Sequence, residues 1–183
     1  MKSNFAICFF ICLLSTIQTE SLQTDNWNIA HYGDRTFENL DFCGYITLDG
    51  TKIHKKTHID GYLQAHSAEF DQLSVKGHAR IQESHIHRET KVEGELLAIS
   101  VKFSEKLTCR CSKITLSRCK LDSLYIQKLD NGAEPVVELC DGTKISGSII
   151  FESKHGKVIA SKNSIPQNVK RGKVEVKDIN DRF

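Results

Sequence analysis

The sequence predicts an all-β fold, a three-sided parallel β-helix (solenoid) with about 17 residues per coil. The first observation behind this prediction is a repeat with steps of 17, 16 and 17 residues between Gly44, Gly61, Gly77 and Gly94. The second is that each interval holds three short segments in which apolar and polar residues alternate, as in strands with one buried face. A helical bundle is disfavoured, because the glycines and the many Thr, Val and Ile residues do not fit a 3.6-residue period.

The first element in chain order is an expected secretory signal peptide at residues 1–20. Lys2 supplies a short positive region, and the apolar run Phe5–Leu14 has the length of a signal core. This run is short for a bilayer span, so we expect cleavage near Thr19–Ser21 and no transmembrane span in the mature chain. An uncleaved membrane anchor is the alternative.

Residues 21–40 are polar and are expected to form a linker and an N-terminal cap. Open solenoid ends expose a core layer and unpaired strand edges, so they need such a cover. The apolar residues available for it are Trp27, Ile29, Tyr32 and Phe37.

The β-helix is predicted to occupy residues 41–165. With each glycine counted as position 1, five positions of every coil are expected to point inward, namely positions 3, 5, 8, 10 and the last apolar position before the next glycine. In the four clear coils these residues are Ile46, Leu63, Ala79 and Leu96; Leu48, Ala65, Ile81 and Ala98; Thr51, Ala68, Ser84 and Val101; Ile53, Phe70, Ile86 and Phe103; and Ile59, Val75, Val92 and Cys109. Right-handed crossovers are the general rule for parallel strands and predict a right-handed helix, although left-handed solenoids exist.

The later coils are expected to be less regular. A fifth coil fits the inward pattern after one inserted residue, with Ile114, Leu116, Cys119, Leu121 and Ile126. The turn sequence Asp130–Pro135 is predicted to bulge from the stack. Residues 166–183 form a charged C-terminal tail, in which Val174 and Val176 can add a final strand.

Outward residues support this register because they were not used to choose it. Position 17 alternates in sign from coil to coil, and in-register stacking brings such charges within reach of each other. The residues at position 17 are Asp60, Lys76, Glu93 and Arg110, and those at position 9 are Lys52, Glu69, His85 and Lys102.

Composition argues against several functions. The net charge of +2 gives no reason to expect nucleic acid as a partner. The sequence holds none of the common nucleotide, hydrolase or metalloprotease motifs, and its carboxylates are spread over charge-balanced columns. We therefore expect a protein that is not an enzyme and that needs no cofactor.

The strongest cluster for chemistry is at positions 9 to 11, where outward residues of neighbouring coils meet. Glu69 and Asp71 are expected to face His85 and His87, with His54 on the coil before. Two carboxylates and two imidazoles suit zinc, copper or nickel. The alternative, which we favour, is a solvated ladder of charges, because a flat strand surface lacks the concave surroundings of metal sites.

Two further groups of residues are candidates. Cys109 and Cys111 lie two residues apart, so both sulfurs share one face and could form a disulfide or thiol site; the alternative is small core residues. Five cysteines follow the signal segment, so at least one thiol should remain free. Tyr45, Tyr62 and His78 share position 2 and are expected to stack as a strip that binds sugars or protein, or that only stiffens the sheet.

The glycine-led turns, such as Val92-Glu93-Gly94-Glu95-Leu96 and Ile145-Ser146-Gly147-Ser148-Ile149, resemble those of the bactofilin (polymer-forming cytoskeletal) family over Asp41–Ile159. The resemblance implies a right-handed β-helix that polymerises end to end through apolar end coils, without catalytic residues. Bactofilins are usually cytoplasmic, whereas this chain carries a signal segment and many Cys and His residues. The short Gly-Ser-Ile turns are also similar to head-GIN-type putative adhesin domains, which are exported bacterial β-solenoids.

We therefore expect a non-enzymatic scaffold, exported to the periplasm or surface of a bacterium, whose partner is another copy of itself or a cell-envelope component. A surface adhesin or glycan-binding module is one alternative, and a periplasmic metal-binding protein is the other.

Overall fold

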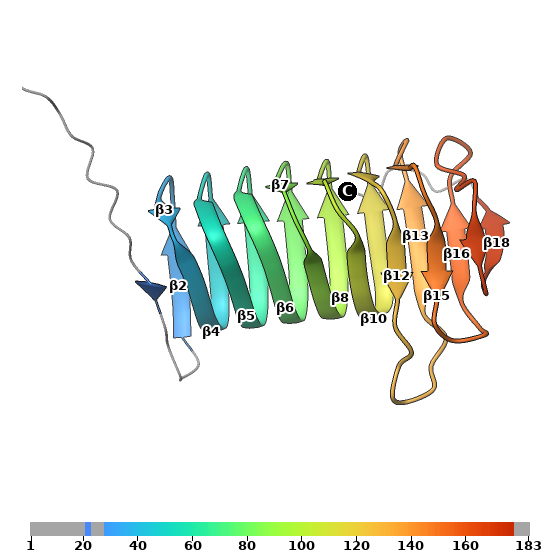
Figure 1. Ribbon diagram of the computed structural model, residues 1–183, viewed down its shortest axis with the longest axis horizontal. Helices are drawn as coiled ribbons and strands as arrows, with labels where there is room; N and C mark the ends of the chain where they lie inside the picture. The colour runs from blue at the N-terminus through green and yellow to red at the C-terminus, as the bar shows by residue number, and fades with distance from the viewer. Residues whose placement is uncertain (1–20, 23–27, 178–183) are drawn as a thin grey trace, which may run out of the picture.

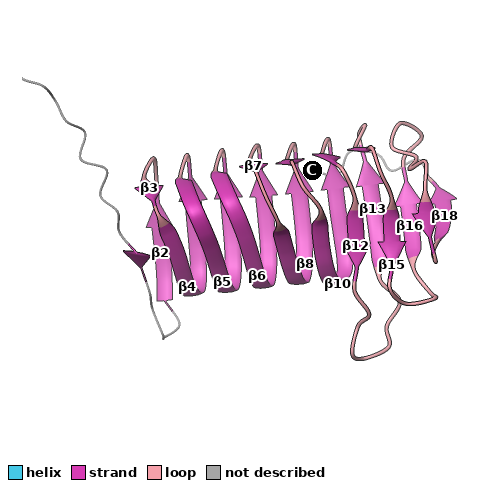
Figure 2. Cartoon of the chain, viewed as in Figure 1, coloured by secondary structure: helices cyan, strands magenta, loops and turns pink. Residues whose placement is uncertain are grey.

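A computed structural model describes residues 21–22 and 28–177 of the chain. These residues form strands stacked in parallel as a β-solenoid of about nine turns with about 17 residues per turn, and they contain no α-helix (Figures 1 and 2). The predicted fold class is therefore confirmed. The expected signal peptide and Trp27 lie outside the described residues.

The strands differ in length because some run through a corner of the coil and others cover a single side. In chain order they are β1 (Ser21–Leu22), β2 (Asn28–Tyr32), β3 (Thr36–Phe37), β4 (Asn39–Asp49), β5 (Lys52–His66), β6 (Glu69–Gln82), β7 (His85–Ile86), β8 (Thr90–Ile99), β9 (Lys102–Phe103), β10 (Leu107–Ser117), β11 (Lys120–Leu121), β12 (Leu124–Ile126), β13 (Val136–Cys140), β14 (Lys144–Ile145), β15 (Ile149–Phe151), β16 (Lys157–Ala160), β17 (Val169–Lys170) and β18 (Lys173–Val176).

Pairing of equivalent segments in successive coils gives the solenoid three faces. The first face holds the parts of β4, β5, β6, β8 and β10 before the corner, followed by β12, β15 and β17. The second face holds β2, the parts of the long strands after the corner, then β13, β16 and β18. The third face is built from short rungs in β3, β5, β6, β7, β9, β11 and β14.

The corner between the first and second faces is a column of glycines, formed by Gly44, Gly61, Gly77 and Gly94. Gly77 has φ +127, and a Cβ there would lie 2.0 Å from the carbonyl oxygen of Gly61. No other residue fits so close to the backbone of the previous coil. The column explains why the repeat is marked by glycine.

Cys111 takes the corresponding place in the fifth coil, opposite Gly94. The register shifts between Cys111 and Lys113, which confirms the single inserted residue that the sequence predicts. This β-bulge lets the corner residue carry a side chain, because the extra residue re-aims the strand. The sulfur of Cys111 consequently points into the core, where Cys111 is 0% exposed.

A second column forms the corner between the second and third faces. Six successive coils have a residue of positive φ there, and five of the six are not glycine: Gly50, Ser67, Glu83, Ser100, Arg118 and Asp141. A small buried residue follows, and its hydroxyl can bind the turn: Ser84 Oγ donates to Gln82 O at 2.6 Å and accepts from Ala68 N at 3.0 Å. The sequence pattern indicated the small residue at position 8 but not the strained residue before it.

The core runs along the solenoid axis. Every inward residue predicted for the first five coils is buried, with at most 5% exposure. The later coils continue this core with Val137, Leu139, Ile149, Phe151 and Val158. Loop 127–135 leaves the stack between β12 and β13, as the turn sequence predicts (Figure 1). No helix within the described residues is long and apolar enough to cross a membrane.

Candidate functional site

The most ordered surface feature is an aromatic strip on the second face, formed by Tyr45, Tyr62 and His78. In-register pairing of β4, β5 and β6 places the three residues in one column. The Tyr45 and Tyr62 rings are stacked at 4.9 Å between centroids with an interplanar angle of 10°. His78 continues the stack at 6.1 Å and 28°. Tyr45 is 36% exposed, so the strip is accessible to solvent.

Polar groups border the strip. The Tyr45 hydroxyl donates to Gln64 Oε1 at 3.0 Å, and His78 Nδ1 lies 3.3 Å from Glu95 Oε2. A hollow of about 300 Å³ adjoins Tyr62 and His78, and its polar lining includes Arg80 and Lys113. An aromatic surface beside paired charges suits a sugar ring or a peptide side chain, since it offers one apolar contact and several hydrogen bonds.

The predicted metal cluster lies on the third face. His87 Nε2 lies 2.7 Å from Glu69 Oε1, and His85 Nε2 lies 2.8 Å from Ser104 Oγ. The two imidazole rings are 4.0 Å apart between centroids. Asp71 instead pairs with Arg88, whose Nε is 3.1 Å from Asp71 Oδ1. The structure thus brings Glu69, His85 and His87 together and engages Asp71 elsewhere.

Electrostatics at this cluster follow from these contacts. The hydrogen bond from His87 lowers the pKa of Glu69. Desolvation lowers the pKa of His85, and the charges of His87 and Lys102 act in the same direction. Within the described part of the chain, no group of three or more His, Cys, Asp and Glu residues has the arrangement of a metal site. Metal binding stays a prediction.

Both cysteines of the predicted thiol site point into the core. Cys109 and Cys111 are 0% exposed, and the Cys111 sulfhydryl donates to Val92 O at 3.4 Å. Burial, together with the neighbouring Cys111, raises the pKa of Cys109, and burial raises the pKa of Cys119 to about 11. Cys109, Cys111 and Cys119 carry free thiols. Since the thiolate is the reactive form, these environments favour inert core thiols.

The outward charge columns keep the predicted register, but their ion pairs differ from a simple ladder. In the position-17 column, the contact of Glu93 is Lys91 on its own strand, at 3.1 Å, and Arg110 pairs with Asp130 of the protruding loop at 3.7 Å. In the position-9 column, Lys52 lies 3.9 Å from Glu69. Side chains two residues apart on one strand face the same way. They can therefore form ion pairs with each other in place of pairs with the neighbouring coils.

Sequence reasoning missed the continuation of the position-9 column. Lys120 pairs in register with both Lys102 and Lys144, so the third face ends in three stacked lysines. The inserted residue and the long loop obscure this register in the sequence. The recurring signal was a lysine followed by a buried apolar residue: Lys102-Phe103, Lys120-Leu121 and Lys144-Ile145.

No protein-family model matches this chain, and no curated protein or solved structure matches it either.

Proposed function

We propose that this protein is a non-enzymatic, exported scaffold that associates end to end, each copy extending the β-solenoid of the next. The observation that carries the proposal is the C-terminal end of the stack. Among the described residues β18 pairs with β16 on one side only, and its inward Val174 and Val176 are 44% and 48% exposed. An uncovered core layer on an unpaired strand is a surface for strand addition.

The opposite end of the solenoid offers a complementary surface. Following the pairings from β2 to β18 places Lys173 in the same column as Ile29. If a second copy continues the stack in this register, its Ala30 covers Val174 and its Tyr32 covers Val176. Ala30 and Tyr32 are only partly buried against the core of their own copy. The outward Glu175 of one copy then lies beside the outward His31 of the next, so the contact brings no like charges together at this position.

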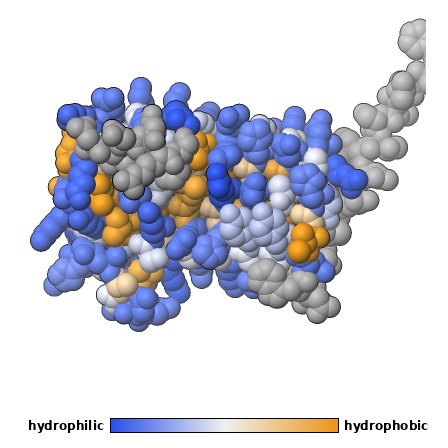
Figure 3. Space-filling view, turned by 180° about the vertical axis from the view of Figure 1, so that it is seen from behind, coloured by the Kyte–Doolittle hydropathy of each residue, from blue (hydrophilic) through white to orange (hydrophobic). Residues whose placement is uncertain are grey.

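The sides of the solenoid are less suited to close association. The side seen in Figure 3 is covered largely by hydrophilic residues, with separate hydrophobic patches. A head-to-tail contact uses two different surfaces, so it produces open chains rather than closed dimers. The apolar signal segment at residues 1–20 supports export, and the bactofilin-like turns support a polymer-forming role.

The test is the assembly state of the mature chain by size-exclusion chromatography with light scattering and by negative-stain imaging. We expect oligomers that lengthen with concentration. Val176→Lys should yield monomers, because the charge would be buried at the contact between copies. Thr47→Lys places the same residue on the side of β4 and should leave assembly unchanged. A wild-type chain that is monomeric at all concentrations contradicts the proposal.

Glycan binding through the aromatic strip is a second candidate function. It is supported by the stacked Tyr45 and Tyr62 rings and by the hollow beside Tyr62. Screening the mature chain against a glycan array should reveal a ligand, and Tyr62→Ala should weaken its binding about tenfold or more while circular dichroism stays unchanged. Tyr125→Ala, on the first face, is the matched control. An array without any hit removes this function and leaves the scaffold proposal intact.

A further inference from the structure

The C-terminal half of the third face carries an arrangement that folding alone does not explain. Lys102 of β9, Lys120 of β11 and Lys144 of β14 occupy successive rungs of one parallel ladder. All three are exposed, and adjacent rungs of a sheet are about 4.8 Å apart. We refer to these three residues as the lysine ladder.

Like charges directly opposite each other destabilise a sheet. Earlier in the same column the chain avoids this: Lys52 lies 3.9 Å from Glu69 on the next rung. The lysine ladder has no such partner, since no described carboxylate forms an ion pair with any of its three side chains. Three unpaired cations in register therefore oppose folding and form a linear array of positive charge.

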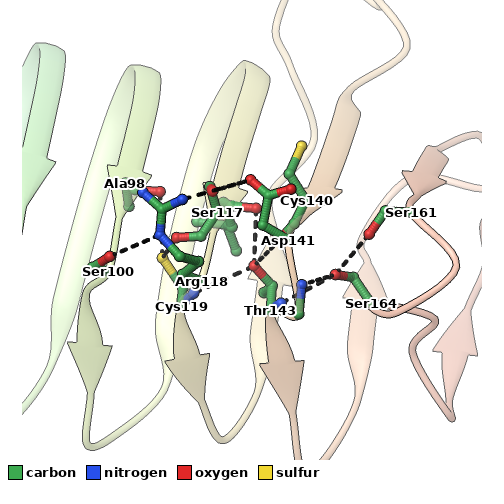
Figure 4. Close-up of polar contacts among 12 residues, drawn as sticks. Ala98, Ser100, Ser117, Arg118, Cys119, Cys140, Asp141, Thr143, Ser161 and Ser164 are labelled. Atoms are coloured by element: carbon green, nitrogen blue, oxygen red, sulfur yellow. Dashed lines mark hydrogen bonds and ion pairs between the residues drawn. The ribbon is translucent and has the colours of Figure 1, made fainter. Parts of the chain in front are cut away.

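The lysine ladder lines a hollow of about 730 Å³. One wall is loop 161–168, which contributes Asn163, Ile165 and Gln167 to the lining. This wall is anchored by Ser164, which is 3% exposed. Its Oγ accepts hydrogen bonds from Gly142 N at 2.9 Å and from Thr143 N at 3.0 Å (Figure 4). A buried serine thus holds the loop against the turn that leads into Lys144, so the hollow is a formed feature of the fold.

The other residues that line the hollow indicate which uncharged groups of a ligand it can bind. Asp122 lines the same hollow and accepts hydrogen bonds from Ser123 Oγ at 3.2 Å and Ser146 Oγ at 3.4 Å. The amides of Asn163 and Gln167 offer donors and acceptors, and Ile165, 55% exposed, offers an apolar contact. Carboxylate, amide and hydroxyl groups are the partners that sugar hydroxyls need.

We propose that the lysine ladder and its hollow bind an acidic polysaccharide, lying along the solenoid axis with one carboxylate or sulfate near each lysine. The in-register cations match a polymer with regularly repeated charges. Nucleic acid is the less suitable polyanion: within the described lining the one aromatic residue, Phe103, is only 2% exposed, so no ring is available for base stacking. The proposal is independent of end-to-end association.

The test measures binding of the mature chain to immobilised heparin as the sulfated probe and polygalacturonate as the carboxylated probe, at low and at physiological salt. We expect binding to at least one probe and none to neutral dextran. Each single Lys→Gln change in the lysine ladder should weaken binding about fivefold, and the triple change on the order of 100-fold. The dependence of log K on log salt should become shallower by about one for each lysine removed.

Lys52→Gln is the matched control, because Lys52 lies in the same column but is paired with Glu69. It should leave binding unchanged. Lys120→Gln supplies an independent readout: it should weaken binding while the melting temperature stays constant or rises, since it removes like-charge repulsion. Two outcomes overturn the proposal, namely no binding of either acidic glycan at low salt, and equal binding by the wild-type and the triple variant. Tighter binding of a single-stranded oligonucleotide than of both glycans overturns the choice of polysaccharide.

Discussion

The first four coils, residues 44–110, and the later coils, residues 111–177, keep the same core by different means. In the first region each coil is held to the previous one at a corner where glycine backbones touch. In the later region that corner has no glycine column, and side-chain hydrogen bonds such as Ser117 Oγ to Asp141 Oδ2, at 2.7 Å, fasten neighbouring coils. Backbone contact imposes uniform coils, whereas side-chain contact tolerates loops. The hollow with the lysine ladder spans the transition into this second region and depends on one of its loops.

The largest expected effect comes from breaking the glycine corner. Gly77→Ala places a Cβ 2.0 Å from the carbonyl oxygen of Gly61, at a φ of +127, and neither backbone can move without shifting a whole coil. We expect a loss of more than about 4 kcal/mol in the free energy of unfolding, or failure to fold. Urea denaturation followed by far-UV circular dichroism measures this loss.

Gly132 provides the matched control from the later region. It also has positive φ, at +70, but a Cβ there meets nothing within 4 Å. Gly132→Ala should therefore lose only about 1 kcal/mol. An equal free energy of unfolding in the two variants would mean that the close approach of the glycine backbones does not matter for the stability of the first region.

The next effect tests the side-chain fastening of the later coils. Thr143 Oγ1 donates to Cys140 O at 2.8 Å and accepts from Cys119 N at 3.3 Å. Thr143 is 3% exposed, so Thr143→Val keeps the shape and removes the acceptor that the side chain offers to Cys119 N. Cys140 O loses one donor and keeps the backbone amides of Arg118 and Thr143. We expect a loss of about 1–3 kcal/mol in the free energy of unfolding, measured by urea denaturation. A neutral result would mean that the later coils do not depend on this hydroxyl.

The same substitution in the first region should have the opposite sign. Thr90 is 0% exposed, and its Oγ1 has no hydrogen-bond partner. Because a buried unsatisfied hydroxyl is unfavourable, Thr90→Val should raise the free energy of unfolding by about 1 kcal/mol. Comparing the melting temperatures of the two Thr→Val variants separates a general preference for valine in strands from the local hydrogen bonding.

The first region was more predictable from the sequence than the second. Its glycines and its inward residues, such as Ile46 and Phe70, follow from the repeat alone, because each coil copies the backbone path of the previous one. The single insertion near Cys111 was also predicted. The residues of positive φ, such as Glu83 and Arg118, left no signal, since their conformation is imposed by the stacked corners rather than by local preference.

The surface was harder to predict than the core. The register placed Glu69, His85 and His87 near each other, but it could not show that Asp71 pairs with Arg88, because long side chains choose among several neighbours. The lysine ladder was missed because the register of Lys120 and Lys144 depends on an insertion and a loop of unknown path. The repeat therefore predicts which column each residue occupies. It does not predict which of several neighbours a long outward side chain contacts, or the register beyond an insertion or a long loop.

The smallest effect concerns His85, which lies where the position-9 column changes from the Lys52–Glu69 pair to the lysine ladder. Desolvation and the charges of His87 and Lys102 lower its pKa, against a weaker opposing effect of Glu69. Lys102→Gln should therefore raise the pKa of His85, as measured by NMR titration of its imidazole protons. Lys52→Gln, two rungs away on the paired side, should change it less.

The lowered pKa of His85 also makes stability depend on pH. A base whose pKa is lower in the folded state binds more protons when unfolded. Its contribution to stability is therefore complete above its unfolded pKa of about 6.5, and it is lost as the pH falls from that value through the lower pKa of the folded state. The lowered pKa of Glu69 extends the loss to more acidic pH. His85→Gln should flatten the stability profile near pH 6 by a few tenths of a kcal/mol, since the group is partly solvated. His31→Gln, outside the position-9 column, is the control and should leave the pH profile of stability as in the wild type. If His85→Gln also left it as in the wild type, neighbouring charges of the position-9 column would have no measurable effect on His85.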